Sequence, residues 1–166
     1  PYRVFLDWVR SRLVALGFEE MSGPLVESDF WDMDALFMPQ FHSARDIHDA
    51  YYIKDASASD IPDKLLKKVK AVHESGGDTG SSGWKYHFDV ERTKQMLLRT
   101  QTTACSARKL ASGPVVPGKY FAVARCFRYD VVDATHLPDF NQTEGFVISQ
   151  VLDMRLLIAL LNMFSE

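Results

Sequence analysis

Several features that mark other protein classes are scarce in this chain of 166 residues. Its two cysteines, Cys105 and Cys126, lie in no CxxC or Cys/His array, so we expect no structural zinc and a reducing compartment. The five histidines show no HExxH-like spacing, and we expect no metal ligands within the chain. No apolar run reaches the roughly 18 residues that a membrane span needs, and no charged-then-apolar leader opens the sequence. We therefore expect a soluble, cytoplasmic protein.

A strong charge of either sign is missing as well. The net charge of −3 excludes a wholly basic nucleic-acid-binding domain, so any contact with RNA must be local or made by other parts. Four lysines gather between residues 64 and 70, but such a run is more often a solvated helix face than an RNA site. GxxxxGK[ST] and GxGxxG are absent too, so any bound ATP is held without a P-loop or a Rossmann turn.

What the chain does have is the composition of one globular domain, with 46% hydrophobic and 25% charged residues. The spacing of apolar residues predicts an α+β order of elements. The glycine-rich stretch 75–83 predicts a flexible loop, because it offers too little apolar surface to offset its ordering entropy. The expected elements are a helix over 2–16 that stops at Gly17, a strand within 18–28, a short helix capped by Asp29 that runs to Phe37, a strand at 50–54, a helix at 62–75, a strand at 96–99, a helix at 103–111, strands at 120–128 and 140–149, and a terminal helix.

The strands at 120–128 and 140–149 are joined by roughly ten residues, which is longer than an ordinary hairpin loop, and long hairpin loops are often functional. Because side chains alternate along a strand, Gln142 and Glu144 share one face of the second strand. A carboxylate on an interior strand face is costly unless it meets a cation or several donors. Glu144 beside Gln142 therefore suggests a bound ammonium ligand, for which small residues on the first strand leave room.

Two cationic or donor side chains stand at the ends of the same loop. Arg128 can bind a phosphate through two parallel hydrogen bonds, and His136 can donate a hydrogen bond that depends on its protonation. Together they indicate a nucleotide site. A single Arg or His at a strand end is, however, more often a surface salt-bridge partner, and spacing by itself leaves both interpretations open.

The run CFRYDVVDATHLPDFNQTEG at 126–145 resembles motif 2 of class II phenylalanyl-tRNA synthetases of the archaeal and eukaryotic type. The resemblance implies an incomplete class II synthetase-like antiparallel sheet flanked by helices. It implies a single partial catalytic domain over 1–166, with a motif 1 region at about 2–28, a motif 2 hairpin at about 118–150 and the flexible insertion at 75–83. Further runs resemble the same subunit in the same order: GPLVES at 23–28 with FW at 30–31, DALF at 34–37 with PQ at 39–40 and ARD at 44–46, LRTQTT at 98–103 with SAR at 106–108, and the glycine-rich loop followed by Gly83 and Trp84.

The resemblance also implies a reaction and its ATP contacts. Phenylalanine is activated with ATP and Mg²⁺ to phenylalanyl-adenylate and then transferred to tRNA(Phe). Arg128 matches the arginine that grips the α-phosphate and the phenylalanine carboxylate. Asp130 stands where Glu is frequent and helps to hold the adenine end, while His136 matches a histidine that contacts the outer phosphates. Such transfer depends on positioning and on cations rather than on a nucleophilic triad.

The phenylalanine site follows from the same resemblance. Gln142 and Glu144 match the pair that holds the α-ammonium group, Thr103 assists them, and Gln101, where many relatives carry His, lines the pocket. The implied partner is a β subunit, in a heterotetramer of two α and two β subunits.

The chain ends before the motif 3 arginine of this family and lacks its N-terminal tRNA-contacting region, so we expect a fragment that is weakly active or inactive alone. The terminal helix is apolar around most of its circumference and must be covered, by a partner or by self-association of the fragment. Its apolar residues are Leu152, Met154, Leu156, Leu157, Ile158, Leu160, Leu161 and Phe164.

Two other functions stay open at the level of sequence. A sister class II synthetase for phosphoserine or pyrrolysine would share motif 2, although a carboxylate at Glu144 would repel phosphoserine. A non-catalytic synthetase-like module would keep the fold as an interaction surface, although Arg128, Gln142 and Glu144 argue against such decay.

Overall fold

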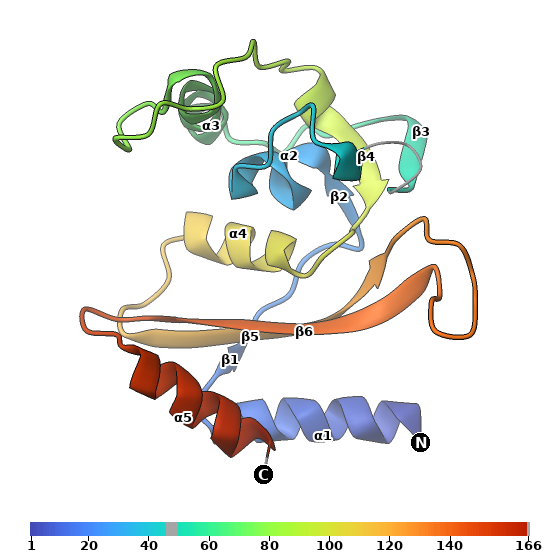
Figure 1. The fold of residues 1–166 in the computed structure, drawn as a ribbon, viewed down its shortest axis with the longest axis vertical. Helices are drawn as coiled ribbons and strands as arrows, with labels where there is room; N and C mark the ends of the chain where they lie inside the picture. Colours follow the sequence, from blue (N-terminus) through green and yellow to red (C-terminus); the bar gives the residue numbers. More distant parts are fainter. Residues whose placement is uncertain (46–49, 166) are drawn as a thin grey trace.

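The computed structural model describes residues 1–45 and 50–165. Its elements stack in layers (Figure 1), with a long hairpin near the middle, two helices on one side of it and, on the other, helix α4 followed by a second sheet and α3. The α+β class is confirmed. The helices are α1 (Tyr2–Ala15), α2 (Asp29–Asp32), α3 (Asp63–Ser75), α4 (Thr103–Ala111) and α5 (Met154–Ser165), with 3-10 turns η1 (Asp34–Leu36), η2 (Ser43–Arg45) and η3 (Arg92–Lys94); the strands are β1 (Glu19–Glu20), β2 (Val26–Ser28), β3 (Tyr52–Ser57), β4 (Gln95–Leu98), β5 (Gly118–Phe127) and β6 (Asp139–Ile148).

The first sheet has the order β1-β5-β6 and is built on the predicted hairpin. β5 and β6 pair antiparallel from Gly118 opposite Ile148 to Phe127 opposite Asp139, and β1 adds to β5 in parallel. Alternation divides the hairpin into two faces. One face packs Phe121 against α1, and the other packs Ala122 in a cluster with Cys105 of α4. The hairpin therefore carries α4 on the face that bears Gln142 and Glu144.

The second sheet, of order β2-β4-β3, is antiparallel throughout. Helix α2 follows β2 directly and buries Phe30 and Trp31 against Ala107 of α4, with apolar side chains of α3 on its other side. The edge-on contact between the rings of Phe30 and Trp31, 5.0 Å between centroids, adds to this core. The two sheets are thus joined through α2 and α4, and the polypeptide that enters α4 runs between them (Figure 1).

Glycines end two of the helices, and the first of them, Gly17, is the stop that the sequence predicts. Gly17 has a φ of +81° and donates its N–H to the carbonyl of Val14, which closes α1. Gly76 has a φ of +86° and closes α3 in the same left-handed conformation. Glycine suits both positions because a Cβ atom disfavours positive φ. Residues 77–80 form a turn, and the Thr79 hydroxyl donates to the carbonyl of Gly76.

The structure corrects three expectations. The stretch 18–28 forms two short strands in different sheets rather than one, because Gly23 and Pro24 separate β1 from β2. Ser28, not Asp29, caps the next helix, since its hydroxyl accepts the N–H of Trp31 at 3.5 Å. That helix ends at Asp32 and resumes as η1. The expected strand at 50–54 is β3 and begins at Tyr52, and Asp46 of the ARD run lies outside the described residues.

Helix α5 is apolar around its circumference, as expected, but in this chain it is covered on one side only. Leu160 is 9% exposed, whereas Met154 and Leu161 are 67% and 58% exposed. A cavity of about 440 Å³ separates α5 from Phe121 and the outer face of β6, and side chains of α1 and α5 line it. Among the described residues, no helix is both long and apolar enough to cross a bilayer.

Candidate active site

The central feature is the face of the hairpin that looks toward α4. In the β5–β6 register, Glu144 lies opposite Ala122, Gln142 opposite Ala124 and Phe140 opposite Cys126. The prediction that an amide and a carboxylate share one face and stand across from small residues is confirmed. Small side chains on β5 leave the two polar groups free to reach toward α4.

Glu144 is half-buried and receives donors from the start of α4. Its carboxylate accepts hydrogen bonds from the hydroxyls of Thr103 at 2.5 Å, Ser106 at 2.7 Å and Thr102 at 3.4 Å, and from the amide Nε2 of Gln142 at 3.1 Å. Ser106 and Thr102 were not among the sequence predictions for the site. Their signal was the recurrence of hydroxyls at 102, 103 and 106, which one turn of a helix brings to the same side.

None of these contacts supplies a positive charge to the carboxylate. All four donors are neutral, and in the described part of the chain no Lys, Arg or His forms an ion pair with Glu144. The N-terminus of α4, where Thr103 is the first helical residue, adds the positive end of a nine-residue helix dipole. The carboxylate therefore meets hydrogen-bond donors and the helix terminus but no cationic side chain, an arrangement that suits an ammonium ligand.

Gln101 is held just before α4 by the last residue of α2. Its Nε2 donates to the backbone carbonyl of Asp32 at 2.8 Å. The carboxylate of Asp32 in turn accepts the hydroxyl of Thr100 at 2.6 Å and the N–H of Thr100 at 3.3 Å. Burial raises the pKa of Asp32 to about 7, because the hydrogen bonds from Thr100 only partly offset desolvation. Asp32 therefore anchors both residues that lead into the helix.

Arg128 directly follows β5 and is exposed. Its guanidinium lies over the ring of Phe140, 5.0 Å from the centroid, and its backbone N–H donates to the carbonyl of Pro138 at 3.0 Å. Phe140 shares the face of Gln142 and Glu144, so the cation stands at the outer end of the same row. A cavity of about 250 Å³ beside it brings Arg128, Asp130 and Gln101 together, with Met33, Met38, Ala44 and Thr100 as further lining residues.

His136 lies apart from both groups. It is an exposed loop residue whose ring Nδ1 lies 2.9 Å from Asp133 Oδ1. Its backbone N–H donates to the same oxygen at 2.8 Å. Hydrogen bonds from Thr135 and His136 lower the pKa of Asp133 to about 2. The structure thus places Thr103, Gln142 and Glu144 in one group and Gln101, Arg128 and Asp130 in another. No described contact joins His136 to either group.

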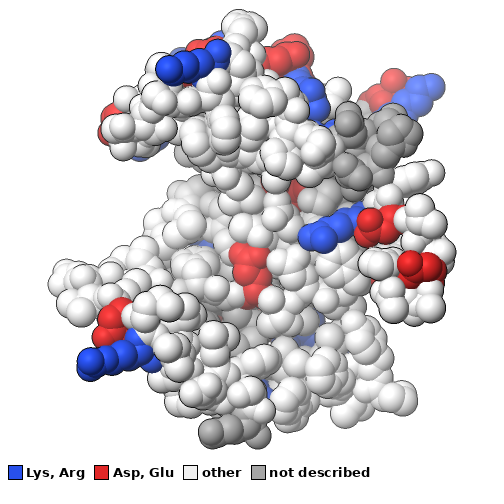
Figure 2. Space-filling view, in the orientation of Figure 1, with Lys and Arg blue, Asp and Glu red and all other residues white. Residues whose placement is uncertain are grey.

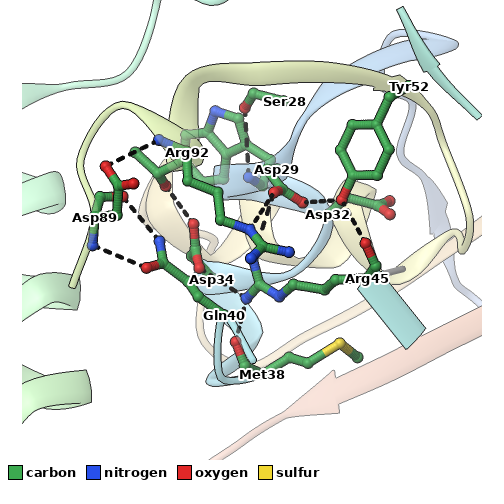
Figure 3. Close-up of polar contacts among 12 residues, drawn as sticks. Ser28, Asp29, Asp32, Asp34, Met38, Gln40, Arg45, Tyr52, Asp89 and Arg92 are labelled. Carbon is green, nitrogen blue, oxygen red and sulfur yellow. Dashed lines mark hydrogen bonds and ion pairs between the residues drawn. The ribbon is translucent and has the colours of Figure 1, made fainter. Parts of the chain in front are cut away.

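A buried ionic cluster beneath the second sheet was missed by sequence reasoning (Figure 3). Arg45 has no exposed side-chain surface and lies between Asp34, at 2.7 Å, and Asp29, at 3.6 Å. Tyr52 donates its hydroxyl to Asp29 at 3.3 Å, and Thr93 donates to Asp34. Burial raises the pKa of Asp29 to about 6 against the lowering effect of Arg45. The cluster holds η1, η2 and β3 around α2, so it supports the segment that carries Asp32.

On the face seen in Figure 2, surface charge does not gather into one patch of a single sign. Figure 2 shows Lys and Arg side chains scattered over this face, most of them next to acidic ones. The absence of wholesale basic character in the sequence therefore holds for the surface seen in this view. Among the described residues, no group of three or more His, Cys, Asp or Glu side chains could bind a metal.

Comparison with known proteins adds to this geometry. The sequence model described as tRNA synthetases class II core domain (F) matches residues 1–166. Phenylalanine–tRNA ligase alpha subunits from Treponema pallidum (strain Nichols) and Thermococcus kodakarensis are 55% and 48% identical over 165 and 167 residues, which is 99% of this chain in both cases. The chain spans 30% and 33% of the length of these two relatives.

A solved structure supports the fold alone. A pyrrolysyl-tRNA synthetase from Desulfitobacterium hafniense superposes with a TM-score of 0.58 over 99% of this chain and 45% of its own, at 13% identity. The family match over the whole sequence, the similar fold and the antiparallel hairpin with its Arg, Gln and Glu side chains agree. This chain belongs to the family of class II tRNA synthetase core domains.

Proposed function

We propose that the protein containing this chain is a phenylalanine–tRNA ligase alpha subunit, which activates phenylalanine with ATP and transfers it to tRNA(Phe). The observation that carries this proposal is the row of Arg128, Gln142 and Glu144 on one sheet face, in a chain that is 55% identical to a subunit of that name. The guanidinium can bind a phosphate of ATP, and the carboxylate can bind the ammonium group of phenylalanine.

In this proposal the amino acid is held by its ammonium group. Glu144 supplies the negative charge, and Gln142, whose Nε2 already donates to Glu144, offers its Oε1 as a second acceptor. Thr103 keeps the carboxylate in place by its 2.5 Å hydrogen bond, and Gln101 lines the adjoining cavity. The phenylalanine carboxylate is then directed toward the outer end of the row, where Arg128 stands.

The chemical step joins a carboxylate oxygen of phenylalanine to the α-phosphorus of ATP, and the bond from that phosphorus to the bridging oxygen breaks as pyrophosphate leaves. A ribose hydroxyl of tRNA(Phe) then attacks the acyl carbonyl, and AMP leaves. Arg128 binds the α-phosphate and the incoming carboxylate and so reduces their mutual repulsion. We assign Asp130 to the adenine end and His136 to the outer phosphates, since both lie in the exposed loop after β5.

Mg²⁺ enters the proposal as a companion of the ATP phosphates. The described residues do not fit a metal held by the chain itself, because they include no cluster of three or more acidic, His or Cys side chains. When bound with ATP, Mg²⁺ would neutralise phosphate charge. What the chain itself contributes is the guanidinium of Arg128 and the ammonium site at Glu144.

We further propose that the protein works in the cytoplasm with a β subunit, in a heterotetramer of two α and two β subunits. Exposed apolar side chains on α1 and α5 support a covered interface, among them Phe5 at 54% and Leu161 at 58%. An isolated 1–166 piece is expected to self-associate and to be weakly active or inactive, as a partial catalytic domain with its motif 1 region at about 2–28, its motif 2 hairpin at about 118–150 and a flexible 75–83 loop.

The test is phenylalanine-dependent exchange of pyrophosphate into ATP by the full-length subunit with its partner. We expect Arg128→Ala to lower kcat by about 10²- to 10³-fold, the usual loss when a charge-stabilising group is removed from a transition state. Arg125→Ala is the matched control, because this exposed arginine lies on β5, three residues before Arg128, and pairs with Asp139 at 3.2 Å. Glu144→Gln is expected to raise KM for phenylalanine more than KM for ATP.

Three results would count against this proposal. Exchange that is supported equally by unrelated amino acids would remove the assignment to phenylalanine. Exchange that depends on pyrrolysine or phosphoserine instead would identify a sister enzyme. The absence of exchange in the complete assembly would indicate a non-catalytic module.

A further inference from the structure

Arg99 is a buried arginine without a carboxylate partner. It follows the last residue of β4 and is 4% exposed. Among the described residues, none of the ion pairs includes it. Burying a guanidinium costs free energy unless hydrogen-bond acceptors satisfy its donors. The acceptors of Arg99 therefore indicate what this buried side chain does.

Its donors reach three separate segments. Nη2 and Nε donate to the carbonyl of Arg125 on β5 at 2.9 and 3.3 Å. Nη1 donates to the carbonyls of Gly23 and Pro24, each at 3.2 Å, and to Cys105 Sγ of α4 at 3.4 Å. The planar guanidinium thus connects three segments, namely β5, the link between β1 and β2, and α4. A lysine, with donors on a single atom, cannot reproduce that spread.

The backbone of Arg99 also forms hydrogen bonds, with β5 and with the residue before β2. Its carbonyl accepts the N–H of Phe127 at 2.8 Å, and its own N–H donates to Leu25 at 3.0 Å. The main chain and side chain of Arg99 together therefore fix Arg125 and Phe127, which lie three residues and one residue before Arg128. The atoms around the guanidinium are closely packed, since a Cβ atom on Gly23 would lie 3.0 Å from Cys105 Sγ and 3.8 Å from Nη1 of Arg99.

In the other direction, Arg99 leads directly into the segment that builds the ammonium site. Thr100 is anchored on Asp32, and Thr102 and Thr103 donate to Glu144. Arg99 therefore stands between the two halves of the candidate site. One half is the end of β5 with its guanidinium, and the other is the entry to α4 with the donors of the carboxylate.

We propose that Arg99 is a positioning residue for amino-acid activation, which sets the end of β5, and hence Arg128, against the segment that supports Glu144. This inference rests on the proposed function. Each substrate is bound mainly by one half, whereas the chemical step needs both halves in register. Loss of the guanidinium therefore lowers kcat and leaves the KM values for ATP and phenylalanine nearly unchanged.

The experiment measures pyrophosphate exchange by the full-length subunit with its partner, as kcat per active site titrated by the adenylate burst. Titration removes any unfolded fraction from the comparison. We expect Arg99→Lys to lower kcat by about 10- to 100-fold and to change either KM by less than about threefold, because displacement by about 1 Å costs up to 10² in rate. Arg10→Lys is the matched control, since Arg10 donates to the Val123 carbonyl of the same strand at 3.3 Å from α1.

A double substitution separates positioning from general support. If Arg99 acts through Arg128, then Arg99→Lys in an Arg128→Ala background lowers kcat by less than about threefold, whereas independent effects multiply. Wild-type kcat per titrated site in Arg99→Lys, or multiplied losses in the double variant, overturns the inference and leaves the proposed function standing. A wild-type assembly without exchange overturns both. Arg99→Met gives a second variant, which removes the charge and all five donated contacts.

Discussion

Replacing Asp32 by Asn should make the stability of the protein less dependent on pH. Asp32 has no exposed surface, and among the described residues its carboxylate oxygen Oδ1 has no hydrogen-bond partner. Burial raises its pKa from 3.8 to about 7. A carboxyl group with a raised pKa favours the folded state when it is protonated. Its stabilising contribution is therefore complete below about pH 4 and is lost as the pH rises through 7.

The magnitude follows from these two pKa values. Between pH 5 and pH 8, the difference in proton binding between the folded and unfolded states lowers the free energy of unfolding by about 2.5 kcal/mol. Asn cannot ionise, and its Oδ1 can still accept the hydroxyl and the N–H of Thr100. The free energy of unfolding of Asp32→Asn minus that of the wild type should therefore increase by about 2.5 kcal/mol over this range.

The measurement is urea unfolding of both proteins at pH 5, 6, 7 and 8. Buried Asp29 and Asp34, whose pKa values are also raised, are present in both proteins, so the difference reports mainly on position 32. Asp78→Asn serves as a control for the exchange of Asp for Asn, because that side chain is 75% exposed and surface ion pairs contribute little to stability. A difference for Asp32→Asn that stays constant from pH 5 to 8, or that falls, would refute the reasoning.

Three further predictions concern the site and the core. Ser106→Ala removes a 2.7 Å hydrogen bond to Glu144 and should raise KM for phenylalanine several-fold in pyrophosphate exchange, for a loss of about 1 kcal/mol; an unchanged KM would remove Ser106 from the ammonium site. Glu27→Gln removes the negative charge that Arg108 contacts at 2.6 and 2.8 Å, and it should lower the free energy of unfolding by about 3 kcal/mol in urea; a loss below about 1 kcal/mol would contradict the importance of this pair. Phe30→Ala empties a fully buried position and should cost about 3–5 kcal/mol by the same measurement, unlike Phe41→Ala at a position that is 65% exposed.

The elements that the sequence predicted well are those whose signals are local. The helices at 2–16, 62–75 and 103–111 appear within one residue of their expected ends, because apolar spacing and glycine stops depend on neighbours along the chain. The hairpin was predicted with the correct face for Gln142 and Glu144, because side-chain alternation fixes that face once a strand is assigned.

The roles given to Asp130 and His136 stay predictions. The role of Asp130 came from the resemblance of the loop to motif 2, and that of His136 came from the same resemblance and from its place near the end of the loop. The structure brings Asp130 into the cavity beside Arg128, and it leaves His136 hydrogen-bonded to Asp133. A loop contact with a substrate depends on atoms that the chain does not supply, so neither periodicity nor spacing could predict it.

By itself, then, the sequence determined the family, the α+β order and the row of polar groups on the hairpin, since each is written in adjacent or regularly spaced residues. The tertiary structure decided what those groups touch. Glu144 takes its donors from α4, Arg99 joins segments that are far apart in sequence, and Arg45 is buried between two aspartates. A buried charge is tolerated only where distant donors or acceptors converge on it, and that convergence depends on how the layers pack.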